Sequence, residues 1–263
     1  MLNLKMSTFN KMNKLILVIA LIVPFNITWA QEFKTDYKED VLTFINCIKN
    51  HNKAKLTSLT TFPFRRNYPL PDIKNEDEFI KRYYEIFDDS LINMIVNSDL
   101  KNNWTAVGWR GIMLNHGVIW LDSHGRLIAV NYQSNSERIK REKLIENDKN
   151  SIHESLKNFA QPKLLLETEK FRIRIDELSN EVYRYASWYI NSTMNEKPDL
   201  VIESGSWMPE GNGGNNKYEF VNGDYKYECS INVVGTDETP AADLTVYKDE
   251  KEILYQAAKI IRN

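Results

Sequence analysis

The stretch that most constrains the fold is residues 104–132, WTAVGWRGIMLNHGVIWLDSHGRLIAVNY. It predicts three successive β-strands joined by tight turns at 115–117 and 122–125, each ending in a glycine that supplies the positive φ of a hairpin turn. Residues 118–121 are apolar on both faces of the middle strand, so each face needs a cover. We expect the preceding helices on one side, and either more protein or a ligand on the other.

Helical patterns precede these strands. Residues 36–52 open with a capping box and continue with an apolar stripe, and Asn75 begins a second helix in the same way. Helices followed by a strongly curved antiparallel sheet predict an α+β fold in which the helices pack on an open cone. With the run V-G-W-R-G-I-M-L at 107–114, this order resembles the NTF2-like or cystatin-like class. The chain also resembles uncharacterised secreted bacterial proteins with an FP loop and a G-I-M-L hairpin, a kinship that implies no reaction.

The pattern changes after residue 134. Residues 135–163 are charged, with apolar residues at helical spacing, and predict a linking helix. In residues 164–263, apolar and polar residues alternate in short segments, and Asn222-Gly223 is a strong hairpin signal. This pattern predicts a mostly antiparallel sandwich or small barrel. The predicted organisation is therefore an N-terminal α+β domain at 31–134, this linker, and a β-rich domain at 164–263.

The first 30 residues have the pattern of a secretory signal peptide. Three lysines precede the apolar run 15–23, and small residues at 28–30 give a cleavage site that ends near Ala30. The run is shorter than the roughly 20 residues of a membrane-spanning helix, although an uncleaved anchor is the alternative. Translation starts at Met1 or at Met12. We expect a periplasmic or secreted protein without stable membrane insertion once the leader is cleaved.

The charge of the chain disfavours some partners. The whole sequence has a formal net charge of −2, and removing the leader, which contains three lysines and no acidic residue, leaves a net charge of −5. A mildly acidic chain without a basic cluster binds nucleic acid and anionic membranes poorly, so we expect no nucleic acid partner.

Two cysteines, Cys47 and Cys229, are present. In an oxidising compartment they suggest a disulfide, and two buried free thiols are the equal alternative. No spacing typical of a zinc site occurs, and the four histidines form no recognisable catalytic set. We therefore expect no metal, no cofactor and no catalytic residues, and an enzyme is the less favoured class.

Arg110 is the residue that most suggests a ligand. It lies between Trp109 and Gly111 in a predicted strand of core residues, where a guanidinium must pair or line a cavity. With Trp109 and Trp120 it would floor a pocket for an acidic or planar ligand. The alternatives are a solvent-facing side chain or an ion pair with Asp88 or Asp89.

The C-terminal strands carry more aromatic residues than one inner face of a small sheet needs. They are Tyr183, Tyr185, Trp188, Tyr189, Trp207, Tyr225 and Tyr227. Either they contact a protein or glycan, or both faces of the sheet are buried. The leading hypothesis is an exported binding protein with an envelope protein as partner, such as an enzyme or toxin that it inhibits. The alternative is a small-molecule-binding or enzymatic NTF2-like pocket.

Overall fold

The computed structural model describes residues 35–179, 181–211 and 213–261. The expected leader, its cleavage site and both candidate start codons lie outside the described residues. Within the described part of the chain, no helix is both long and apolar enough to cross a membrane.

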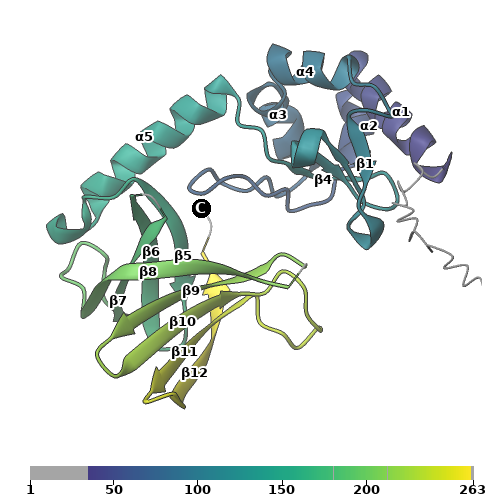
Figure 1. The fold of residues 1–263 in the computed structure, drawn as a ribbon. Coiled ribbons are helices and arrows are strands. Elements are labelled where there is room, and N and C mark those ends of the chain that lie inside the picture. The colour runs from purple at the N-terminus through teal and green to yellow at the C-terminus, as the bar shows by residue number, and fades with distance from the viewer. Residues whose placement is uncertain (1–34, 180, 212, 262–263) are drawn as a thin grey trace, which may run out of the picture. The chain divides into compact units, whose positions relative to one another are not determined.

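The N-terminal part combines four helices with a small sheet (Figure 1). Its helices are α1 Thr35–Lys49, α2 Lys53–Ser58, α3 Glu76–Ile86 and α4 Asp89–Val96, and its strands are β1 Trp104–Ala106, β2 Ile112–Leu114, β3 Ile119–Leu121 and β4 Leu127–Val130. The helix starts follow from the sequence, because the side chain of Asn75 accepts the backbone N–H of Glu78 and that of Asp88 accepts the N–H of Leu91. Apolar residues from all four helices and all four strands form one core.

The sheet is antiparallel in the order β1-β2-β3-β4. Its first predicted strand is interrupted, because Gly108–Arg110 form a 3₁₀ turn, η1, between β1 and β2. Gly108 and Gly111 have φ values of +58° and +99°, a region that side chains with a Cβ disfavour. A Cβ on Gly111 would also lie 2.1 Å from the carbonyl oxygen of Leu121, so this turn requires glycine.

The largest element is a closed antiparallel barrel of eight strands (Figure 1). The strands are β5 Gln161–Glu167, β6 Phe171–Ser179, β7 Val182–Tyr189, β8 Leu200–Glu210, β9 Asn215–Asn222, β10 Tyr225–Ile231, β11 Ala242–Lys248 and β12 Lys251–Ile260. Each strand pairs with its neighbours in sequence, and β12 closes the barrel by pairing Lys259 with Glu167 and Ile260 with Leu166 of β5. A barrel, rather than a sandwich, is thus the structure of the second half.

The predicted fold class, helices on an NTF2-like curved sheet, is wrong. The four strands of the N-terminal sheet are only three or four residues long, too short to form a long curved cone. The chain is mostly β, and its long strands belong to the barrel. The barrel, which the period-2 alternation of the second half of the sequence encodes, is therefore the dominant part of the fold.

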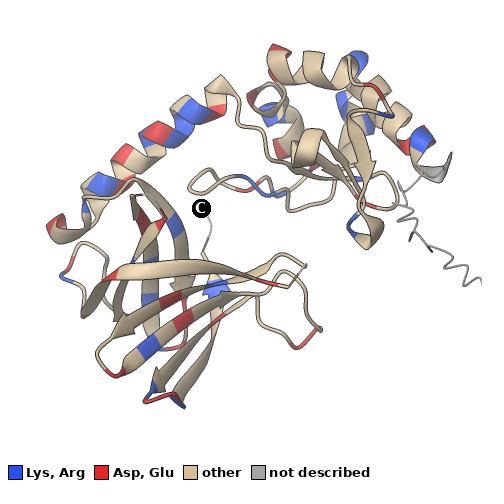
Figure 2. Ribbon diagram, viewed as in Figure 1, with Lys and Arg blue, Asp and Glu red and all other residues tan. Residues whose placement is uncertain are grey.

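The helix α5, Asn135–Ser151, and the 3₁₀ turn η3, Glu154–Leu156, connect the two halves of the sequence. Cationic and anionic residues follow one another along α5 (Figure 2). After the helix, Ile152, Leu156 and Phe159 pack with Ala186 and Trp188 of β7 in a separate apolar cluster. The outer face of β7 is therefore buried as well as its inner face.

Buried charges strengthen this attachment. Arg174 of β6 pairs with Asp176 on its own strand and with Asp148 of α5, at 2.8 and 2.6 Å. Arg184 of β7 shares Asp176 at 2.8 Å. Because Arg174, Asp176 and Arg184 are almost fully buried, each of these charges needs its partners, and removing one would leave another uncompensated.

Candidate functional site

The three residues of the predicted pocket lie in two elements, the turn η1 and the strand β3. Trp109 and Arg110 lie in η1, where both are exposed, Trp109 to 69%. Trp120 lies in β3, half-buried, with its ring against Gly117. An exposed guanidinium keeps its water, so Arg110 needs neither a buried partner nor a cavity. The proposed ion-pair partner Asp88 instead caps α4 and accepts the hydroxyl of Tyr132 at 2.9 Å.

Both cysteines are buried free thiols in the structure. Cys47 belongs to the core of the N-terminal part, and Cys229 belongs to the core of the barrel. Burial raises the pKa of each thiol. Neither thiol has the character of a nucleophile, because the reactive form is the thiolate.

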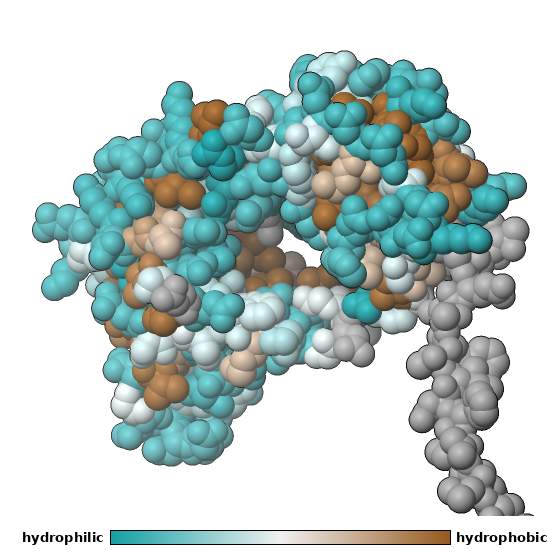
Figure 3. Space-filling view, turned by 45° about the horizontal axis from the view of Figure 1, so that its top comes forward, coloured by the Kyte–Doolittle hydropathy of each residue, from teal (hydrophilic) through white to brown (hydrophobic). Residues whose placement is uncertain are grey.

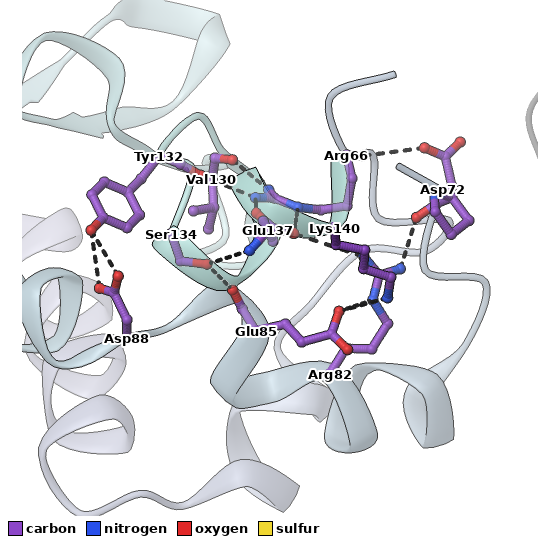
Figure 4. A network of polar contacts seen from close by, with 11 residues as sticks. Arg66, Asp72, Arg82, Glu85, Asp88, Val130, Tyr132, Ser134, Glu137 and Lys140 are labelled. Atoms are coloured by element: carbon purple, nitrogen blue, oxygen red, sulfur yellow. Dashed lines mark hydrogen bonds and ion pairs between the residues drawn. The ribbon is translucent and has the colours of Figure 1, made fainter. Parts of the chain in front are cut away.

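The polar network in Figure 4 surrounds the start of α5. Arg66 donates from Nε to Glu137 at 2.7 Å and from Nη2 to the carbonyl of Tyr132 at 3.0 Å. Lys140 of α5 pairs with Glu85 of α3 at 2.9 Å. Burial acts to raise the pKa of Glu85, but the hydrogen bonds and charges of Lys140 and Arg82 outweigh it and lower that pKa. The network holds α5 against the N-terminal part, which is a structural task.

The strongest candidate site is a cavity of about 260 Å³ at one end of the barrel. It lies where β6, β8, β10 and β12 begin and β7 and β11 end, and we call it the mouth cavity. Its aliphatic lining consists of Leu200, Leu244, Val246, Ile253 and Leu254. Its aromatic lining consists of Phe171, Tyr185, Tyr189, Tyr225 and Tyr227. A barrel of eight strands is wide enough either to be filled by side chains or to hold one small ligand.

The floor of the cavity is formed by fixed side chains. Tyr185, Leu244 and Val246 are each less than 10% exposed. The ring of Tyr185 lies 5.5 Å from that of Tyr227 and 5.4 Å from that of Phe220, centroid to centroid, so three aromatic rings hold one another in place. Burial raises the pKa of Tyr185 and of Tyr227, which keeps both phenols neutral.

The rim is more open. Tyr189 and Ile253 are 62% and 53% exposed, and the ring of Phe171 lies 5.7 Å from that of Tyr189. Large apolar side chains at an opening to solvent are accessible to a ligand without any rearrangement of the floor.

Two polar residues complete the lining, Ser187 and Asp199. Asp199 is fixed through the backbone of β7: its own N–H donates to the carbonyl of Ser187 at 2.9 Å, and its carboxylate accepts the N–H of Tyr189 at 3.0 Å. The cavity thus has an apolar wall and a few positioned polar groups, which is the usual composition of a small-molecule site. Among the described residues, no group of three or more His, Cys, Asp or Glu is placed to hold a metal.

The sequence drew attention to part of this site through its surplus of aromatic residues. Four of its aromatic residues, Tyr185, Tyr189, Tyr225 and Tyr227, belong to the surplus that the sequence suggested for an external contact or a second buried face. Nothing in the sequence indicated that Leu200 and Asp199 line a cavity, because only the closure of the barrel brings the start of β8 to it.

Comparisons with protein-family models, with curated proteins and with solved structures found no match. They neither support nor refute the resemblance of residues 107–114 to the NTF2-like class.

Proposed function

We propose that this protein is an exported binding protein that holds a small, largely apolar ligand in the mouth cavity of its barrel. The observation that carries the proposal is the cavity itself: an apolar wall of ten aromatic and aliphatic residues, open at the rim and fixed at the floor. A cavity of about 150 Å³ holds benzene, so by proportion this one accommodates about ten non-hydrogen atoms. A single ring with a short chain fits that size.

Binding, rather than catalysis, is the activity that the lining supports. Among the described lining residues, the hydroxyl groups belong to Ser187 and to tyrosines, and the one carboxylate accepts a backbone N–H. Among the described lining residues, no side chain with the character of a general base is placed against a nucleophile. Export is a separate part of the proposal and rests on the leader sequence.

Two tryptophan substitutions on neighbouring residues of β8 test the site. Leu200 lines the cavity, whereas Val201, the next residue, does not, and is 38% exposed. Binding of small aromatic probes such as toluene and indole would be followed by ligand-observed NMR. We expect Leu200→Trp to fill the cavity and abolish binding, and Val201→Trp to leave it intact. Equal binding by both variants, or no binding by the unsubstituted protein, would contradict the proposal.

A protein partner is the second candidate function. It is favoured by large apolar side chains that remain exposed on the barrel strands, among them Trp207, Val221 and Tyr255 at 45–54%. On the face shown in Figure 3 the hydrophobic residues lie in several small groups among hydrophilic ones. The immobilised protein would be exposed to an extract of its cell envelope. One dominant, saturable protein that also binds Leu200→Trp would support this function, and no such protein would contradict it.

A further inference from the structure

The mouth cavity has an unusual balance of charge and aromatic surface. Five of its twelve lining residues are aromatic, and four of these five are tyrosines. Among the described residues that line it, Asp199 is the only charged one, and none is a lysine, arginine or histidine. A neutral apolar ligand needs no carboxylate at the rim, and an anionic ligand would be repelled by it.

Aromatic faces combined with a carboxylate suit an organic cation. The face of an aromatic ring is electron-rich and attracts ammonium groups within about 6 Å of the ring centre, most strongly where water is excluded. The buried floor ring of Tyr185 and the half-buried ring of Tyr227 provide such faces away from bulk water. Asp199 adds an opposite charge: its carboxylate accepts one backbone hydrogen bond from β7, and its backbone N–H donates another to that strand.

The paired strands β10 and β11 show that the rings at this end of the barrel already accept cations. Lys248 has its ammonium group 5.4 Å from the ring centre of Tyr225, a lining residue. Lys226 lies in the same way over Tyr247, at 4.6 Å.

Resting on the function proposed above, we infer that the ligand of the mouth cavity is an organic ammonium ion, a substituted amine or quaternary ammonium group seated among the tyrosine rings and paired with Asp199. The apolar substituents of such an ion contact the aliphatic wall, and its charged group lies between the tyrosine rings and the carboxylate of Asp199. Ser187 provides a polar side chain beside Asp199 for a hydroxyl or amine hydrogen of the ligand.

Choline and 3,3-dimethylbutan-1-ol provide the direct test, because they have the same shape and differ in charge. Their dissociation constants for the full chain would be measured by calorimetry or by NMR titration. We expect choline to bind about tenfold more tightly or better, as expected of a partly desolvated cation–π site. Asp199→Asn should remove most of this preference and leave the affinity for the neutral alcohol unchanged. Glu203→Gln, which removes an exposed acid of β8 outside the lining, is the matched control and should leave the preference intact.

The possible failures are distinguishable. Equal affinity for the two compounds, or a preference that survives Asp199→Asn, overturns the ammonium assignment and leaves the apolar binding function standing. If neither compound binds and toluene and indole also fail, the proposed function itself is wrong. Choline binding that persists in Leu200→Trp places the cation outside the mouth cavity and also overturns the inference.

Discussion

Gly205→Ala tests the packing on which the barrel depends. Gly205 lies in β8 under the fully buried ring of Phe220. A Cβ at this position would lie 2.1 and 2.3 Å from two carbons of that ring, well inside van der Waals contact. The ring cannot simply move away, because Tyr185 lies 5.4 Å from it, centroid to centroid. Overpacking of this kind costs about 1–3 kcal/mol, and we expect the upper half of that range.

Urea unfolding, followed by tryptophan fluorescence, measures the cost. The exposed neighbour Ser206→Ala is the control and should change the free energy of unfolding by less than about 0.5 kcal/mol. Phe220→Ala should cost about 3–5 kcal/mol by itself, but it removes the obstructing ring. In that background Gly205→Ala should cost less than about 0.5 kcal/mol, so the two substitutions are strongly non-additive. An equal cost of Gly205→Ala in both backgrounds would refute the reasoning.

Two further predictions concern groups outside the mouth cavity. The pKa of Glu85 is lowered from its ordinary value of 4.5, so its carboxylate stabilises the fold above pH 4.5, and this contribution is lost as the pH falls through the lowered pKa. The variant Glu85→Gln should therefore be less stable than the parent at neutral pH and should lose less stability on acidification. Parallel pH profiles of the urea midpoints of the two proteins would contradict this. Cys47 and Cys229 should resist a thiol reagent in the native protein, because burial raises the pKa of each thiol, and both should react in guanidinium, where that burial is lost. Two cysteines that are unreactive in guanidinium and become reactive after reduction would instead show the disulfide.

The local features of the fold could be predicted from the sequence. Asn75 caps the helix that its spacing predicts, and the hairpin signal at Asn222-Gly223 is confirmed by the pairing of Asn222 with Tyr225. These features depend on residues close in sequence, so turn and cap chemistry is enough to identify them.

The closure of the barrel could not be predicted in this way. It depends on the pairing of Lys259 with Glu167, residues far apart in the chain, and no local pattern specifies that partner. The alternation of strand residues shows that two faces exist but not which one is inside. For that reason the surplus tyrosines could not be assigned to a cavity.

Arg110 is solvent-facing, as one alternative of the sequence analysis had it, but it does not lie in the predicted strand. Its apolar neighbours suggested a buried strand, but the positive φ values of Gly108 and Gly111 turn the chain outward at this point. Glycine marks a place where the backbone can bend, and the sequence alone does not say which way the intervening side chains then face.

The most direct test of the central claim is a methyl-detected NMR titration of the full chain with toluene. We predict saturable shifts of the methyl signals of Leu200, Leu244, Val246 and Leu254, which line the mouth cavity, and none for Leu91 and Ile112 in the core of the N-terminal part. Shifts confined to exposed methyl groups such as those of Val221, or no saturable shift at all, would contradict the account.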